Sequence, residues 1–219
     1  MQTMKVKGVI FDLDGVICFT DEFHYRAWEK LANRIGIYFD RNINNRMRGV
    51  SRMQSLEILL ERSQKKYDQK EKNDFADEKN RYYVDFLKTM DKNDLAEDCI
   101  NTLLSLKEDG ILTAIGSSSK NTPIILKRLG LNDLFDAVAD GNCISRSKPD
   151  PEVFLKAAEM LGLSPRECIV VEDAIAGIDA GIAGGFITVG TGSAYDYEKS
   201  DFRIKKLSDI PNIVKRSES

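Results

Sequence analysis

The sequence is poor in the patterns that stabilise small cross-linked or zinc-bound domains. Its four cysteines, Cys18, Cys99, Cys143 and Cys168, lie far apart and form no CxxC pair. A disulfide framework or a structural zinc site therefore has little support. Free thiols fit a reducing compartment, so we expect a cytoplasmic protein.

Long runs of one kind of residue are also missing. No segment approaches the roughly twenty apolar residues needed to cross a bilayer, and the N-terminus has no signal-type apolar segment. Basic residues are dispersed and the net charge is −3, so nothing indicates nucleic acid or an anionic membrane as a partner. There is no internal repeat or low-complexity segment. We expect a globular chain that acts as a monomer.

The second half of the chain alternates apolar strand patterns with helical patterns. The 219 residues, 42% of them hydrophobic, can fill the core of one large domain or of one domain with an insertion. The alternation predicts an α/β fold with a mainly parallel sheet flanked by helices on both faces. Strands are expected at 111–115, 137–139, 169–171 and 186–189, helices at 122–129, 151–161 and 174–183, and a short strand and closing helix within 201–213.

About a hundred residues separate the first strand pattern from the second, whereas a parallel crossover needs only a dozen or more. Helical spacing fills this interval, and Thr20 is a candidate cap for its first helix. The excess predicts an inserted helical subdomain at 19–92, within a core made of 1–18 and 93–219. The helices are expected at 21–35, 51–62, 68–90 and, back in the core, 96–108.

The first strand pattern ends abruptly in two acids, Asp12 and Asp14. Side chains two apart in an extended backbone point the same way, so both carboxylates would face one site. Gly15 would let the chain turn sharply away. Such a pair indicates metal binding, acid–base chemistry or a carboxylate nucleophile. The alternative is a buried strand followed by an ordinary polar turn.

Three later strand ends carry polar residues that a parallel sheet would bring to the same edge. The turn 116–121 is rich in hydroxyls and leads into a helix, which suits a phosphate, although serine-rich turns are usually only helix caps. Lys148 would offset clustered negative charge, or it is a solvated surface lysine. Glu172 and Asp173 end another apolar strand, where capping the next helix is the alternative role.

Taken together, these groups are the parts needed for phosphoryl transfer through an aspartyl phosphate. Four acids near one another require compensating cations, which makes Mg²⁺ the economical inference. Mg²⁺ and Lys148 would remove the repulsion between a phosphate and an attacking carboxylate. Asp12 is the expected nucleophile because it comes first off the strand. Asp14 would donate a proton to the leaving oxygen and later accept one.

From about residue 6 to residue 190 the chain resembles the haloacid dehalogenase superfamily. The resemblance implies a Rossmann-like core, Mg²⁺ and a mobile α-helical cap, which the inserted helical segment matches. It also implies that Asp12, the main-chain carbonyl of Asp14 and Asp173 bind the ion, with Glu172 nearby. The motifs that carry it are Asp12-Leu13-Asp14-Gly15-Val16, Ser117, Lys148-Pro149 and Glu172-Asp173, in this order.

Within that superfamily the sequence is similar to the β-phosphoglucomutase family. The resemblance implies that Ser117 and Lys148 hold the transferring phosphoryl group and that Arg52, Ser119 and Asn121 hold the distal phosphate. His24, Lys79 and the Arg48-Gly49 turn would position the sugar or couple it to cap closure. On helical spacing alone, His24 favours a core or interface role. The residues that complete the expected substrate contacts are Thr20, Ser55, Ser118 and Lys120.

The implied activity is a phosphomutase that interconverts β-D-glucose 1-phosphate and glucose 6-phosphate, with a small sugar phosphate as its partner. Glucose 1,6-bisphosphate would be both intermediate and activator. An alternative is a Mg²⁺-dependent sugar-phosphate phosphatase, which uses the same core motifs. A non-catalytic sensor of phosphorylated ligands is a third reading, against which the intact Asp12, Asp14, Lys148 and Asp173 argue. Cys18, Phe19 and Arg48 depart from the family pattern near the sugar side.

Overall fold

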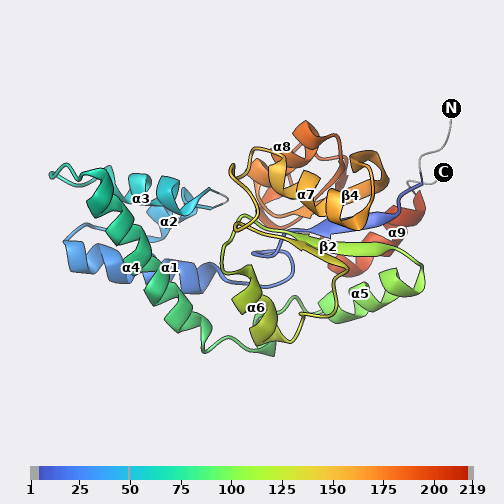
Figure 1. Ribbon diagram of the computed structural model, residues 1–219, viewed down its shortest axis with the longest axis horizontal. Coiled ribbons are helices and arrows are strands. Elements are labelled where there is room, and N and C mark those ends of the chain that lie inside the picture. Colours follow the sequence, from blue (N-terminus) through green and yellow to red (C-terminus); the bar gives the residue numbers. More distant parts are fainter. Residues whose placement is uncertain (1–4, 49, 217–219) are drawn as a thin grey trace. The chain divides into compact units, whose positions relative to one another are not determined.

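The computed structural model describes residues 5–48 and 50–216, and the chain divides into two compact units (Figure 1). The sheet unit consists of Met1–Phe19 and Asp91–Ser219, and the helical unit is Thr20–Met90. The helical unit is inserted between the first strand and the rest of the sheet unit. Its role as a cap stays a prediction.

In the described part of the sheet unit, six strands run parallel, in the order β3-β2-β1-β4-β5-β6. This arrangement confirms the predicted α/β fold. The strands β1 and β4 are fully buried, as expected for central strands covered on both faces. The strands are β1 Gly8–Phe11, β2 Leu112–Gly116, β3 Ala137–Ala139, β4 Cys168–Glu172, β5 Ile187–Gly190 and β6 Phe202–Arg203.

Helices cover both faces of this sheet, with α7 and α8 on one side and α5 and α9 on the other (Figure 1). Phe154 of α7 and Phe186 pack edge to face at 6.2 Å in the core beside Ile10 and Val170. The helices are α5 Cys99–Glu108, α6 Thr122–Leu129, α7 Glu152–Leu161, α8 Ile175–Gly184 and α9 Ile210–Arg216. Short 3₁₀ turns are η1 Lys92–Asp94, η2 Pro165–Glu167, η3 Gly192–Ala194 and η4 Leu207–Asp209.

The register of the three central strands brings their carboxyl ends to one level. Phe11, the last residue of β1, pairs with Ile115 of β2 and with Val171 of β4. The next residue, Asp12, continues the ladder because its N–H donates to the Val171 carbonyl at 2.9 Å. Side chains that follow β1, β2 and β4 therefore converge at a single edge of the sheet.

The helical unit has its own core, in which Trp28 and Leu31 pack with Leu56 and Leu59. The bounds predicted for its first helix are confirmed, but Thr20 makes no side-chain cap hydrogen bond. The short helix α2 was not predicted. Its cap is Asp40, which accepts from the Ile43 N–H at 2.8 Å. The helices are α1 Asp21–Ile35, α2 Arg41–Asn45, α3 Arg52–Leu60 and α4 Gln69–Leu87.

The two chain segments that leave and re-enter the sheet unit are fastened to each other. The Phe19 N–H donates to the Asp94 carbonyl at 2.7 Å, and the Ala96 N–H donates to the Ile17 carbonyl at 3.0 Å. Between them, Cys18 and Leu95 form an antiparallel bridge. We call this pair of segments, residues 17–19 and 94–96, the neck.

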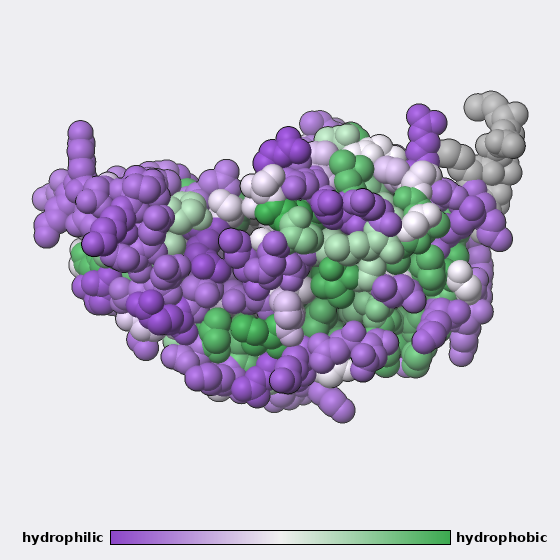
Figure 2. Space-filling view, in the orientation of Figure 1, coloured by the Kyte–Doolittle hydropathy of each residue, from purple (hydrophilic) through white to green (hydrophobic). Residues whose placement is uncertain are grey.

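The surface differs between the units. On the face shown in Figure 2, the helical unit is mostly hydrophilic, whereas hydrophobic patches interrupt the hydrophilic surface of the sheet unit. Exposed apolar side chains of the sheet unit include Leu104 on α5, Met160 on α7 and Ile182 on α8. Within residues 5–48 and 50–216, no helix combines the length and the apolar character needed to span a membrane.

Candidate active site

A buried lysine joins two of the strand ends. The Lys148 ammonium donates to Oδ1 of Asp12 and to Oε1 of Glu172, at 2.5 Å each. The exposed fractions are only 6% for Asp12, 5% for Lys148 and 1% for Glu172. The aromatic ring of Phe154 lies 4.6 Å from the Lys148 nitrogen, measured to the ring centroid. The sequence left open whether Lys148 is solvated, and the structure buries it between two carboxylates.

The electrostatics of this group follow from its burial. Burial alone would lower the pKa of Lys148, but the carboxylates of Asp12 and Glu172 outweigh it and raise that pKa. Burial raises the pKa of Glu172 to about 7, although the positive charge of Lys148 acts to lower it. Lys148 therefore stays charged. Its single positive charge cannot neutralise both the Asp12 and the Glu172 carboxylates when both are ionised.

A cation fits beside this lysine. Carboxylate oxygens of Asp12, Glu172 and Asp173 all lie within 4.8 Å of one another. Such hard oxygen donors are the ligands that Mg²⁺ prefers, and a divalent ion would balance the negative charge that Lys148 leaves. The carboxylate of Asp14 is not part of this cluster, and only its main-chain carbonyl is expected to bind the ion.

Glycines make room for the carboxylates. Gly15 has φ +92°, and a Cβ there would clash with the carboxylate of Asp173. A Cβ on Gly177 would overlap the Glu172 side chain. Any larger residue at either position would displace a carboxylate of the cluster, so these glycines are required by close approach and, at Gly15, by backbone conformation.

Asp14 lies in a tight turn that follows the nucleophile candidate. The N–H groups of Ile17 and Cys18 both donate to the Leu13 carbonyl, at 3.1 and 3.0 Å. The Cys18 thiol also contacts that carbonyl. Burial, followed by the charges of Asp14 and Asp12, raises the pKa of this thiol well above its usual value, so it stays protonated. The half-buried Asp14 is thus carried on a well-bonded turn.

The serine-rich turn after β2 is held by its own side chains and by the turn after β3. The Ser117 hydroxyl accepts from the Ser119 N–H at 3.1 Å, and the Ser119 hydroxyl accepts from the Asn121 N–H at 3.2 Å. From the neighbouring turn, Gly141 donates its N–H to the Ser119 carbonyl at 3.2 Å. A Cβ on Gly141 would clash with the Ser118 carbonyl oxygen, so the two turns pack main chain against main chain.

The members of this turn differ in exposure. Ser117 and Asn121 are buried, Ser118 and Ser119 are half-buried, and Lys120 is exposed. The Ser118 hydroxyl oxygen is buried and finds no hydrogen-bond partner among the described residues. The turn is therefore a preformed set of hydroxyl and N–H groups at the carboxylate edge of the sheet, a suitable lining for a phosphate.

The helical unit contains a second polar cluster. The Lys79 ammonium lies 2.8 Å from Nδ1 of His24 and 4.6 Å from the centroid of the Tyr83 ring, on which His24 stacks at 4.1 Å. Burial lowers the pKa of His24 well below its usual value, and Lys79 and Arg52 lower it further. His24 is therefore neutral and accepts from Lys79 through Nδ1, with its proton on Nε2.

The other residues predicted in the helical unit differ in their exposure and in their partners. Arg52, the first residue of α3, is half-buried, and the charge of Asp77 partly offsets the lowering of its pKa by burial. Ser55 and Thr20 are buried. Arg48 is exposed and forms an ion pair with Asp21. Gly49 lies outside the described residues.

The predicted residues divide between the two units. Phe154, Gly141 and Glu152 support those of the sheet unit but were not among the predicted residues. Their signal in the sequence was weak, because a helix core residue, a turn glycine and a first-turn acid all have common structural roles. The predicted residues that belong to the sheet unit are Asp12, Asp14, Ser117, Ser118, Ser119, Lys120, Asn121, Lys148, Glu172 and Asp173, and those that belong to the helical unit are Thr20, His24, Arg48, Arg52, Ser55 and Lys79.

Known proteins resemble this chain in sequence and in structure. The chain is 41% identical over 207 residues to the β-phosphoglucomutase of Bacillus subtilis, covering 94% of this chain and 92% of that protein. A crystal structure of β-phosphoglucomutase from Clostridium difficile superposes with a TM-score of 0.90, at 37% identity and 97% coverage of both chains. A phosphorylated carbohydrates phosphatase of Thermotoga maritima is 28% identical, covering 82% of each chain.

A family model agrees with these relatives. The model described as haloacid dehalogenase-like hydrolase matches residues 6–185, which include the four strand ends and the whole helical insertion. The chain therefore belongs to the haloacid dehalogenase-like hydrolase family.

Proposed function

We propose that this protein is a phosphomutase that interconverts β-D-glucose 1-phosphate and glucose 6-phosphate. The observation that carries the proposal is the buried Lys148 held between Asp12 and Glu172, in a chain 41% identical to a β-phosphoglucomutase. A lysine in this position compensates negative charge directly beside a carboxylate nucleophile.

In the first half of the cycle, the phosphorylated Asp12 gives its phosphoryl group to the sugar. The 6-hydroxyl oxygen of glucose 1-phosphate attacks phosphorus, the bond from phosphorus to the Asp12 oxygen breaks, and Asp14 takes the hydroxyl proton. The product is glucose 1,6-bisphosphate. This intermediate also activates the enzyme, because it can phosphorylate Asp12 in resting molecules.

In the second half, the bisphosphate presents its other phosphate. An Asp12 oxygen attacks phosphorus at the 1-phosphate, the bond to the sugar oxygen breaks, and Asp14 returns its proton to that oxygen. Lys148 already binds Oδ1 of Asp12, so we assign the attack to Oδ2. Ser117 and Lys148 orient the transferring group, and Ser119, Asn121 and Arg52 are the candidates to bind the other phosphate.

Mg²⁺ fits the carboxylate cluster, and Asp12, Asp173 and the Asp14 carbonyl are its proposed ligands, with Glu172 beside them. When bound, the ion supplies positive charge that offsets the charge of the phosphoryl group. Lys148 then neutralises the remaining charge of Asp12 and Glu172, to both of which it is bound.

We propose that the helical unit serves as a cap. An aspartyl phosphate is hydrolysed by water, so a mutase must exclude water while the bisphosphate reorients. The neutral His24, the buried Lys79 and the half-buried Arg52 are the groups that the helical unit offers to a phosphorylated sugar.

A sugar-phosphate phosphatase is the second candidate function. The specific observation in its favour is the 28% identity to a phosphorylated carbohydrates phosphatase, across 82% of both chains. The two activities share the formation of a phosphorylated aspartate. They differ in whether a sugar hydroxyl or water attacks it.

One experiment separates these functions. The protein is incubated with Mg²⁺, β-glucose 1-phosphate and a trace of glucose 1,6-bisphosphate, and products are followed by phosphorus NMR. We expect glucose 6-phosphate to form. Inorganic phosphate released at a comparable rate would identify a phosphatase. If neither product forms, the assigned substrate is wrong.

A further inference from the structure

Lys148 is held in place by a segment without regular secondary structure. The chain between β3 and α7, residues 140–151, contains neither helix nor strand. Its lysine must nevertheless reach two carboxylates at 2.5 Å each, on the strand ends of β1 and β4. A loop free to move by an ångström would lose that geometry, so another part of the sheet unit must fix it.

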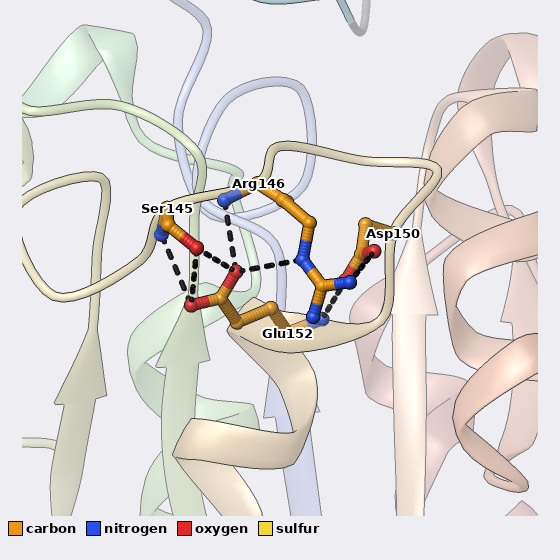
Figure 3. A network of polar contacts seen from close by, with 4 residues as sticks. All are labelled: Ser145, Arg146, Asp150 and Glu152. Atoms are coloured by element: carbon orange, nitrogen blue, oxygen red, sulfur yellow. Dashed lines mark hydrogen bonds and ion pairs between the residues drawn. The ribbon is translucent and has the colours of Figure 1, made fainter.

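The carboxylate of Glu152 meets this requirement (Figure 3). It accepts hydrogen bonds from the N–H of Ser145 at 3.0 Å, the N–H of Arg146 at 2.8 Å and the hydroxyl of Ser145 at 3.0 Å. These donors lie six and seven residues before Glu152 in the sequence. The start of the segment that carries Lys148 is thereby bound to the side chain of Glu152, which follows the end of the same segment.

A second acid, Asp150, makes further contacts within the same segment. Asp150 accepts the Glu152 N–H at 3.0 Å, and the Arg146 guanidinium reaches Asp150 at 3.1 Å and Glu152 at 3.5 Å (Figure 3). The Asp150 N–H also donates to the Ser147 carbonyl at 3.1 Å. Arg146 is largely exposed, so its ion pairs contribute little compared with the main-chain donors.

Glu152 is itself anchored to the core. It is the first residue of α7, whose next residues, Val153 and Phe154, are completely buried against the sheet. The ring of Phe154 also contacts the Lys148 ammonium. The main-chain donors of Ser145 and Arg146 lower the pKa of Glu152 to about 2, so the carboxylate is ionised and accepts these bonds throughout the neutral range.

We propose that Glu152 is a positioning residue for phosphoryl transfer, which holds the 145–150 segment so that Lys148 stays bound between Asp12 and Glu172. It touches neither substrate nor reacting atoms and acts through Lys148. The catalytic part of this inference rests on the proposed function, whereas the placement of Lys148 does not depend on the substrate.

The test uses the whole chain and Glu152→Gln, which keeps the size of the side chain but removes its charge and one strong acceptor. The matched control is Glu159→Gln, which removes an exposed carboxylate from the same helix. Two quantities are measured: the rate at which an N-hydroxysuccinimide acetate reagent labels Lys148, read by mass spectrometry of its peptide, and kcat and KM with Mg²⁺ and β-glucose 1-phosphate.

For Glu152→Gln we expect Lys148 labelling to accelerate roughly tenfold, because the segment opens more often. We expect kcat to fall by roughly 10- to 100-fold from loss of alignment, with KM changed much less. Glu159→Gln should match the wild type in both measurements, and Glu152→Asp, which keeps the charge, should restore part of kcat. Wild-type labelling and kcat in Glu152→Gln would overturn the proposal.

The two proposals fail in different ways. If wild-type protein is inactive on sugar phosphates but Glu152→Gln still exposes Lys148, the proposed function fails and the positioning role stands. If Glu152→Gln does not fold, Ser145→Ala removes one donor to Glu152 and leaves α7 intact. A smaller rise in Lys148 labelling supports the positioning role in that case, and unchanged labelling contradicts it.

Discussion

Lys148 in the sheet unit and Lys79 in the helical unit are both almost completely buried, but their surroundings differ. Lys148 is bound by two carboxylates. Lys79 contacts the neutral ring nitrogen of His24 and the faces of Tyr83 and Trp28. One ammonium group thus lies between negative charges, and the other lies against a neutral imidazole and aromatic rings.

The difference indicates a division of labour. In the sheet unit, the proposed nucleophile Asp12 already binds the Lys148 ammonium without substrate, which is the arrangement that electrostatic preorganisation requires. In the helical unit, a neutral histidine and aromatic faces help to accommodate a buried cation. This contrast supports the proposed roles, which are chemistry for the sheet unit and recognition of a phosphorylated ligand for the helical unit.

The largest effect is expected from removing the carboxylate of the proposed nucleophile, Asp12. Asp12→Asn should lower turnover by about four orders of magnitude or more and abolish phosphoenzyme, which mass spectrometry of the intact protein would detect. Asp14→Asn should impair proton transfer by roughly 10²- to 10⁴-fold while Mg²⁺ affinity, measured by calorimetry, stays close to that of the wild type. Equal loss of Mg²⁺ affinity in both variants would contradict these separate roles.

Replacing each buried lysine by methionine compares the two environments directly. Lys148→Met leaves carboxylates without their buried cation and should lower the free energy of unfolding by about 3–5 kcal/mol. Lys79→Met leaves the Nδ1 acceptor of His24 without this donor and should cost about 1–3 kcal/mol. Urea titrations followed by circular dichroism give both values. Equal losses would remove the distinction drawn between the two lysines.

A smaller effect, on KM, is expected from a substitution in the turn after β3, which packs against the serine-rich turn after β2. Gly141→Ala places a Cβ against the Ser118 carbonyl and should raise KM roughly tenfold by displacing the turn that we propose binds phosphate. Gly130→Ala is the control, since Gly130 has φ +71° and a Cβ there would meet no atom within 4 Å. It should lower stability by about 1–2 kcal/mol without changing KM.

The smallest effect is a pH dependence confined to the helical unit. Because the pKa of folded His24 is depressed, the unfolded chain binds its proton first, near the usual value of about 6.5. The free energy of unfolding should therefore fall as pH drops below about 6.5, by up to about 1.4 kcal/mol per pH unit. Above that pH His24 contributes no slope, since it is neutral in both states.

The single tryptophan, Trp28, makes this slope measurable, because its fluorescence reports unfolding of the helical unit. His24→Asn keeps a neutral acceptor near Lys79 and should lose the slope, whereas other titrating groups affect both proteins equally. A slope of the same size in His24→Asn would show that His24 is not its source.

The sequence predicted those elements whose local signals agree. The bounds of α1, α6 and β3 are confirmed, since periodicity, flanking glycines and turn residues all favour the same limits. Short helices and the ends of long helices were harder to predict. The five residues of α2 are too few to show a helical period, and α4 ends at Leu87, three residues before the predicted limit.

The candidate site was predictable where it depends on strand ends and not where it depends on loop folding. Asp12 follows the apolar strand β1 and Glu172 ends the apolar strand β4, so parallel pairing brings them to one edge. The contacts of Glu152 with Ser145 and Arg146 follow no secondary-structure period. Thr20 is the N-cap residue, as expected, but its side chain makes no cap hydrogen bond, because its backbone is in the α region and not in the extended conformation typical of such caps.

The neck described above makes the helical unit a separable module. Its two segments are joined by the Phe19–Asp94 and Ala96–Ile17 hydrogen bonds, so the ends to which the helices attach are already held together. Closing such ends with a short glycine–serine linker costs little chain entropy. We therefore expect that the helical unit can be excised or exchanged for another helical insertion. Under its proposed role as a cap, recognition of the substrate can change there while the carboxylate edge of the sheet stays unchanged.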